Sequence, residues 1–127
     1  MDKRCVVPAS GPSAVGPYSP AVVAGGLVFV SGQIPQEPRT GKLVTESFET
    51  QCVRVFDNLK IVLEAAGASL DSVVKVTVFL ADLQQFSEMN SVYERYFGSS
   101  KPARACIQAA RLPKDVAIEA DAIAVVA

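Results

Sequence analysis

Two amphipathic helical patterns lie among five apolar strand patterns in this chain of 127 residues, and their order restricts the fold more than any other feature. Apolar side chains recur every three or four residues over 45–66 and again over 82–97, which predicts one helix in each range. Apolar runs bounded by glycine, proline and polar residues predict strands. These are a strand pair within 22–34, strands at 73–80, 103–111 and 116–126, and an optional extra strand at 4–7.

This order predicts an α+β fold with a five- or six-stranded mixed sheet and two helices on one face. Thr45 is expected to cap the first helix, which ends at Gly67. Asp82 is expected to cap the second helix, with Gln85 completing a capping box and Gly98 ending it. The length suits a single domain over residues 1–127.

Two helices leave the other face of such a sheet uncovered, and that face is too apolar to be in contact with water. Alternation in the strand at 73–80 places Val74 and every second residue after it on one side. Val73 and Phe79 then fall on the other side, and Ile123 lies on the corresponding side of the last strand. Because no chain is left over to cover these residues, we expect a second copy of the protein to do so.

The composition excludes several classes of site. The chain has no histidine, which removes Ser-His-Asp and Cys-His catalysis and every histidine-ligated zinc or haem site. Cys5, Cys52 and Cys106 are widely spaced, which indicates reduced thiols and neither a disulfide framework nor a thiolate metal site. Twelve basic and thirteen acidic residues give a net charge of −1, which argues against dedicated nucleic-acid binding.

No targeting segment and no stretch long enough to span a membrane is recognised, so a cytoplasmic protein is expected.

Arg104 is the most suggestive polar residue, because it lies early in an apolar strand directly after Pro102. Alternation puts Arg104, Cys106 and Gln108 on one face of that strand. The planar guanidinium suits a carboxylate or a phosphate ligand. An arginine at a strand end also commonly points to water or pairs with an acid, and spacing alone leaves both interpretations open.

Glu119 lies inside the last apolar strand, where partial burial would raise its pKa and suit it to act as a general base. An ion pair or simple exposure is the alternative interpretation.

Tyr18, in a proline-rich loop, is either a site residue or a structural cover for the core edge. Ser31 and Gly32 can offer backbone N–H groups to an anion, although no phosphate-loop spacing is present.

Asn90 lies inside the second predicted helix at some cost in helix propensity, which suggests a role for its side chain. Cys106 has no histidine to activate it, so a half-buried inert thiol is the favoured interpretation over a nucleophile.

Together these segments resemble the RidA family (reactive intermediate deaminase A, also called YjgF) from about Gly16 to Val125. Each motif is weak by itself, but their order and spacing over the whole chain are highly specific. The motifs are Gly16-Pro17-Tyr18-Ser19, Phe29-Val30-Ser31-Gly32-Gln33-Ile34-Pro35, Asn58-Leu59, Leu63-Glu64-Ala65-Ala66-Gly67, Val74-Lys75-Val76-Thr77-Val78-Phe79-Leu80, Asp82, Phe86, Asn90-x-x-Tyr93, Phe97, Pro102-Ala103-Arg104, Leu112-Pro113-Lys114 and Glu119.

The resemblance implies a chorismate-mutase-like fold that assembles as a homotrimer, with its sheets facing inward and its clefts between subunits. It also implies a deaminase that hydrolyses enamines and imines, such as 2-aminoacrylate and 2-iminobutanoate, to 2-keto acids and ammonia without a cofactor or metal. In such a cleft we expect Arg104 to meet at least one of Tyr18, Asn90 or Glu119 from a neighbouring chain.

The resemblance further implies a role for each matched residue. Arg104, Glu119 and Tyr18 are expected in the catalytic group, where Arg104 binds the substrate carboxylate and Glu119 positions the attacking water. The expected substrate-binding residues are Ser31, Gly32, Asn90 and Cys106, the last largely through its backbone.

The sequence departs from the family pattern at a few positions. Pro20 replaces a common glutamine and Ala120 replaces a larger branched residue, so both are expected to alter the pocket and the substrate preference.

Three alternative functions stay open: a binding or sensor module for small carboxylates such as 2-keto acids, a translation inhibitor or RNase, and a chaperone. Balanced charge and the lack of histidine argue against an RNase.

Overall fold

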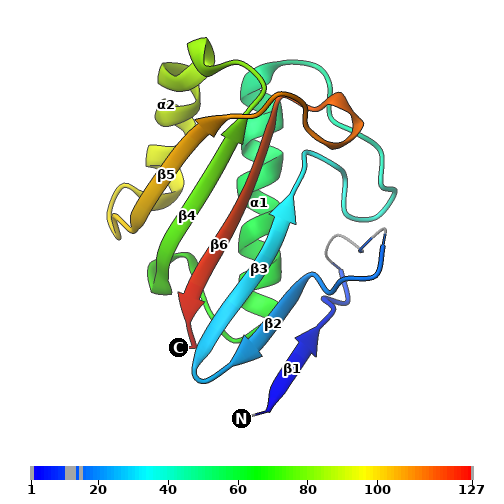
Figure 1. The fold of residues 1–127 in the computed structure, drawn as a ribbon, viewed down its shortest axis with the longest axis vertical. Coiled ribbons are helices and arrows are strands. Elements are labelled where there is room, and N and C mark those ends of the chain that lie inside the picture. The colour runs from blue at the N-terminus through cyan, green and yellow to red at the C-terminus, as the bar shows by residue number, and fades with distance from the viewer. Residues whose placement is uncertain (1, 11–13, 15, 127) are drawn as a thin grey trace.

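The computed structural model describes residues 2–10, 14 and 16–126, so part of the proline-rich loop lies outside it. The described residues form a six-stranded mixed sheet with helices α1 and α2 on one face (Figure 1). Its strand order is β1-β2-β3-β6-β4-β5, in which β4 and β5 run parallel and the other neighbours antiparallel. The strands are β1 (Lys3–Val6), β2 (Ala21–Ala24), β3 (Leu27–Gln33), β4 (Val73–Leu80), β5 (Ala103–Gln108) and β6 (Ile118–Val125).

The predicted α+β order is confirmed, and the optional first strand is present one residue earlier than expected. Helix α1 spans Phe48–Ala65, and its N-cap is Ser47 rather than the predicted Thr45. The Ser47 hydroxyl accepts from the backbone N–H of Thr50, while the Thr50 hydroxyl accepts from the Ser47 N–H, both at 3.1 Å. This reciprocal pair satisfies two N–H groups at the helix start, which Thr45 is too far away to do.

Helix α2 spans Phe86–Phe97 and also begins later than predicted. Asp82 does act as a cap, but of a short 3₁₀ turn over Leu83–Gln85, where its carboxylate accepts from the N–H of Gln84 at 2.9 Å. Gln85 therefore directly precedes α2 and makes no side-chain cap, so the predicted capping box is wrong. In the described part of the chain, neither α1 nor α2 is long and apolar enough to cross a membrane.

The hydrophobic core lies between the two helices and one face of the sheet (Figure 1). Phe56 of α1 is fully buried and makes edge contacts with the rings of Tyr93 and Phe97 on α2, with centroids 5.7 and 5.9 Å apart. From the sheet, every second residue of β6 from Ile118 to Ala124 enters this core, together with Val73, Val76, Val78 and Leu80 of β4. The core therefore fixes α2 against α1 through aromatic packing.

The opposite face of the sheet is exposed and apolar, as predicted. Its large exposed side chains are Phe29, Val74, Ile107 and Val125, at 42%, 44%, 50% and 41% exposure. The prediction for Val74 is wrong, because it placed Val74 on the side of Val76. An irregularity in the pairing of β4 with β6 between Val73 and Lys75 reverses the alternation, so Val73 is buried and Val74 is exposed.

Candidate active site

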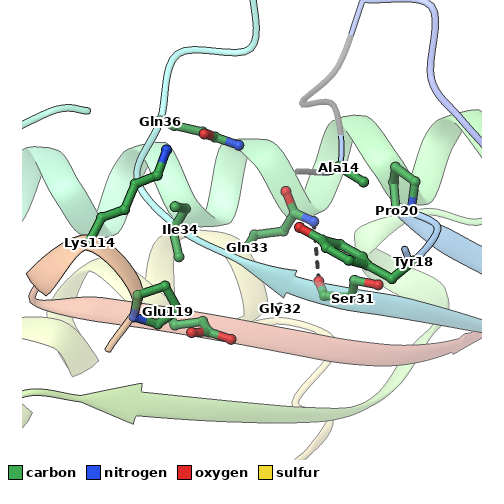
Figure 2. A pocket seen from close by; sticks show the side chains of 11 residues that line it. Ala14, Tyr18, Pro20, Ser31, Gly32, Gln33, Ile34, Gln36, Lys114 and Glu119 are labelled. Atoms are coloured by element: carbon green, nitrogen blue, oxygen red, sulfur yellow. Dashed lines mark hydrogen bonds between the residues drawn. The ribbon is translucent and has the colours of Figure 1, made fainter. Parts of the chain in front are cut away.

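A cavity of about 380 Å³ opens where β3, β6 and the neighbouring loops meet (Figure 2). We call it the Glu119 pocket and define it by Tyr18, Ser31, Gly32, Lys114 and Glu119. Four of these five residues are sequence candidates, and they come from three separate segments of the chain. The fold therefore brings these four candidates together in one pocket.

The carboxylate of Glu119 lies directly over the backbone of Gly32. A Cβ atom at position 32 would collide with Oε2 of Glu119, so any other residue there would force this carboxylate out of its present position. Burial raises the pKa of Glu119, and the nearby charge of Asp121 raises it further. A carboxylate with a raised pKa is a better proton acceptor than an ordinary exposed one, which suits a general base.

Ser31 and Gly32 lie in an irregularity of the sheet. Val30 pairs with Ala122 and Gln33 pairs with Ala120, so two residues of β3 oppose the single residue Asp121 of β6. Such a bulge turns the local backbone away from regular pairing, and bulges are common beside active sites. Here it brings Gly32 under Glu119.

The hydroxyl of Ser31 holds the loop that carries Tyr18. It donates to the carbonyl of Ser19 at 2.6 Å, and the Ser31 N–H donates to the carbonyl of Pro20 at 2.9 Å. The hydroxyl proton of Ser31 is thus donated to a backbone carbonyl, and the hydroxyl oxygen can still accept a hydrogen bond. Tyr18 is half exposed at the pocket, and Figure 2 shows its ring above Ser31.

Lys114 is a pocket residue to which the sequence analysis assigned no role. The backbone φ angles of Lys114 and Asp115 are 56° and 57°, values that residues other than glycine rarely adopt. Two such residues in succession form the sharp turn that brings Lys114 to the pocket wall (Figure 2). The sequence signals at this position were the motif Leu112-Pro113-Lys114 and the proline in it, since proline favours turns.

Of the two departures from the family pattern, Pro20 lines the Glu119 pocket and Ala120 does not. Ala120 is fully buried on the helix side of the sheet, opposite in direction to Glu119. Ala120 therefore does not line the pocket, because alternation along β6 points it into the core.

Arg104 lies in a second cavity, of about 660 Å³, between α2 and the edge strand β5. We call it the Arg104 pocket and define it by Asn90, Tyr93, Lys101 and Arg104. Nη1 of Arg104 donates to Oδ1 of Asn90 at 2.6 Å. The sequence-based suggestion of a side-chain role for Asn90 thus corresponds to a direct contact, made within one chain.

Cys106 and Gln108 share the helix-facing side of β5 with Arg104, as the alternation predicted. In the register, Arg104 is beside Val76 and Cys106 beside Val78, both fully buried. Burial raises the pKa of the Cys106 thiol, and Arg104 only partly opposes that rise. A protonated thiol is a poor nucleophile, so Cys106 fits the inert interpretation.

The two pockets are not one site within a single chain. Strands β6 and β4 separate β3 from β5, and the pocket lining residues do not overlap. Moreover, Arg104 faces the helices, whereas Glu119 and its register partner Phe79 lie on the opposite face of the sheet. The sequence candidates therefore form two groups, Asn90, Arg104 and Cys106 in one, and Tyr18, Ser31, Gly32 and Glu119 in the other.

Among the described residues, no three cysteine, aspartate or glutamate side chains gather in a cluster able to hold a metal ion.

Comparison with known proteins agrees with these observations. The family model described as Endoribonuclease L-PSP matches residues 8–126. A RutC family protein of Pyrococcus abyssi is 52% identical over 98% of both chains. A protein of Salmonella typhimurium named 2-iminobutanoate/2-iminopropanoate deaminase is 43% identical over 96% of this chain and 97% of its own. The crystal structure of E. coli TdcF with bound serine has a TM-score of 0.90 at 41% identity, covering 96% of this chain and 98% of that one.

Proposed function

This chain belongs to the Endoribonuclease L-PSP family, which includes the RidA/YjgF proteins, and on that basis we propose that it hydrolyses reactive imines and enamines of 2-amino acids to 2-keto acids and ammonia. The observation that carries the proposal is the state of Arg104. Its guanidinium is held by Asn90, and the described part of the chain supplies no carboxylate within 4.0 Å of it. A fixed and unneutralised arginine suits a ligand that brings its own carboxylate.

The proposed reaction needs little from the protein, because an imine carbon is already electrophilic. Arg104 binds the substrate carboxylate and so orients the C=N bond. A water oxygen attacks the imine carbon while Glu119 takes a proton from that water. The nitrogen of the resulting tetrahedral adduct takes up the proton held by Glu119 and then the proton of the new hydroxyl group. The C–N bond breaks as the C=O bond forms, which releases ammonia and leaves the 2-keto acid.

Because the two pockets are separate in one chain, this mechanism requires a neighbouring copy. We propose that the Arg104 pocket of one subunit faces the Glu119 pocket of the next, in the homotrimer that the family resemblance implies. The exposed apolar face of the sheet supports such an assembly, since a single chain leaves Phe29, Ile107 and Val125 in contact with water. In this arrangement Asn90 and Arg104 come from one chain, and Tyr18 and Glu119 from the other.

The deciding experiment couples a serine or threonine dehydratase to the protein and follows the release of 2-keto acid. We expect the wild type to accelerate release over spontaneous hydrolysis. Arg104→Lys should lose activity nearly as completely as Arg104→Ala, because a point ammonium does not reproduce the planar fork. Glu119→Gln should still bind keto acid but lose most turnover, by about 10²-fold or more. No acceleration by the wild type would refute the proposal.

A second candidate is a binding module for small carboxylates that does not turn them over. The observation in its favour is the serine in TdcF, a small molecule with a carboxylate. Arg104 serves both functions, whereas a partly buried Glu119 with a raised pKa favours proton transfer and hence the deaminase. Tight binding of serine or pyruvate with no acceleration of imine hydrolysis would favour this candidate over the deaminase.

A further inference from the structure

One side of helix α2 is built around a single guanidinium group. Phe86, Asn90 and Tyr93 follow at spacings of four and three residues, which places their side chains on the same side of the helix. The Cζ atom of Arg104 is 5.4 Å from the ring centroid of Phe86 and 4.6 Å from that of Tyr93. With the hydrogen bond to Asn90, three successive residues of this stripe contact Arg104.

We infer that Phe86 and Tyr93 are positioning residues, whose rings hold the guanidinium plane of Arg104 in the orientation that binds the substrate carboxylate. The inference deepens the proposed deaminase function and rests on it. An aromatic ring attracts a cation through its negative face, and this contact leaves the in-plane N–H groups of arginine free to donate. Asn90 occupies Nη1, and no described residue accepts a hydrogen bond from Nε or Nη2, so both remain for a ligand.

Tyr93 is suited to this role because the core holds its ring in place. The residue is only 8% exposed, and its ring centroid is 4.6 Å from that of Phe97 and 5.7 Å from that of Phe56. Both of these phenylalanines are almost completely buried. A shift of the Tyr93 ring would therefore disturb the packed core. The core thus keeps this ring in a fixed position against Arg104.

The hydroxyl of Tyr93 has no evident function. It is buried and has no hydrogen-bond partner in the part of the chain that the structure describes. Burial accordingly raises the pKa of this phenol, although Arg104 opposes the rise. A buried unpaired hydroxyl destabilises a fold, and this one makes no contact that could orient Arg104. We therefore assign the positioning of Arg104 to the ring of Tyr93 and not to its hydroxyl.

The state of Arg104 supplies the second line of support. A carboxylate that orients an arginine through a bidentate pair also neutralises its charge. In the described residues Arg104 has a neutral amide and two aromatic rings near it, and no ion pair. These neighbours orient the group without neutralising it, so its full charge is available to a ligand carboxylate.

The test compares four variants, each measured for KM and kcat in the coupled assay and for pyruvate affinity by calorimetry. Tyr93→Leu and Phe86→Leu remove one ring each and should raise KM and the pyruvate Kd, by about tenfold for Tyr93 and less for the more exposed Phe86, while kcat changes less. Tyr93→Phe keeps the ring and should restore the lost affinity. Val28→Ala damages the same core from strand β3, where it lines neither pocket and is not among the rings packed on Tyr93, and should lower Tm while leaving KM unchanged.

The position of the guanidinium is measured independently by NMR of the Arg104 Nε–Hε group. Its proton should be shifted by the ring current in the wild type and in Tyr93→Phe, and less so in Tyr93→Leu. This signal decides the inference even if the wild type neither binds pyruvate nor hydrolyses imines, which would refute the proposed function alone.

The inference would be overturned if Tyr93→Leu left both KM and the Arg104 signal unchanged. It would also fail if Tyr93→Phe lost as much affinity as Tyr93→Leu, since that result assigns the effect to the hydroxyl. Should Tyr93→Leu not fold, Phe86→Leu decides the question, because Phe86 is 36% exposed and lies outside the core.

Discussion

The Arg104 pocket and the Glu119 pocket place their charged groups by different means. Arg104 lies between a regular strand and a regular helix, and its neighbours Asn90 and Tyr93 are fixed by packing on the core. Glu119 instead depends on irregular backbone, with a bulge at Ser31–Gly32 on one side and a left-handed turn at Lys114 on the other. Regular elements hold the group that we propose binds a carboxylate, and irregular ones surround the group that we propose moves a proton.

This difference has a physical reason. A carboxylate-binding arginine needs a fixed plane, which packed rings supply. A general base needs partial removal from water and space for a substrate beside it, and a bulge with a glycine provides that space without unfolding the strand. Each pocket is incomplete for the proposed reaction without the other.

The sharpest test of this division mixes two inactive proteins. Arg104→Ala and Glu119→Gln damage different pockets, so a refolded mixture of the two chains should recover activity in about a quarter of the sites of a trimer with clefts between subunits. Arg104→Ala mixed with Asn90→Ala is the matched control, because both changes damage the same pocket of the same chain. Keto-acid release is the measurement, with mass spectrometry confirming mixed trimers.

Recovery in the first mixture and none in the control would support composite sites. If both mixtures stay inactive although mixed trimers form, the two pockets do not share one site. A monomer in sedimentation at micromolar concentration would exclude the assembly itself.

The activity of the Glu119 pocket should be very sensitive to a single added methyl group. Gly32→Ala places a Cβ where the Glu119 carboxylate now lies, so we expect turnover to fall about 100-fold. Gly26→Ala is the matched control: its Cβ would meet no atom within 4 Å, but its backbone φ of +78° strains any side chain. The control should cost about 1 kcal/mol of stability and leave turnover unchanged. The opposite pattern would show that Gly32 does not shape the site.

Strand β5, which carries Arg104, should tolerate the loss of its thiol. Cys106→Ala is expected to keep activity within about threefold of the wild type, with a small loss of packing. The reason is that burial keeps the thiol protonated and the proposed reaction forms no covalent intermediate. Steady-state kinetics measures the effect, and a covalent adduct on Cys106 trapped during turnover would contradict it.

The smallest expected effect is on stability. Burial raises the folded pKa of Glu119 above its unfolded value, so the protonated form favours folding and this benefit is lost as the pH rises through the folded pKa. Glu119→Gln resembles the protonated form at every pH. It should therefore raise Tm at pH 7 by only about 1–2 °C, because Glu119 is partly solvated, and have no effect near pH 4. Equal Tm values at both pH values would mean that burial does not affect this group.

The order of the elements and the grouping of Arg104 with Cys106 and Gln108 were determined by the sequence alone. Both depend on local periodicity, since successive residues of a strand alternate whatever the strand pairs with. The apolar character of the uncovered sheet face was likewise visible in the composition of the strands. The same locality explains the errors at the helix starts, where Thr45 and Ser47 are both acceptable caps and only the partner Thr50 distinguishes them.

The tertiary structure alone decided where the candidate residues meet. The insertion of β6 between β3 and β4 separates the two pockets, and strand order is not encoded in the periodicity of any one strand. The bulges that expose Val74 and place Gly32 under Glu119 exist only relative to a partner strand, since they consist of extra residues opposite that strand. In the sequence, Phe86 and Tyr93 are indistinguishable from the other apolar residues of the second helix. Their contact with Arg104 appears only in the fold, because a contact between distant segments depends on how the whole chain packs.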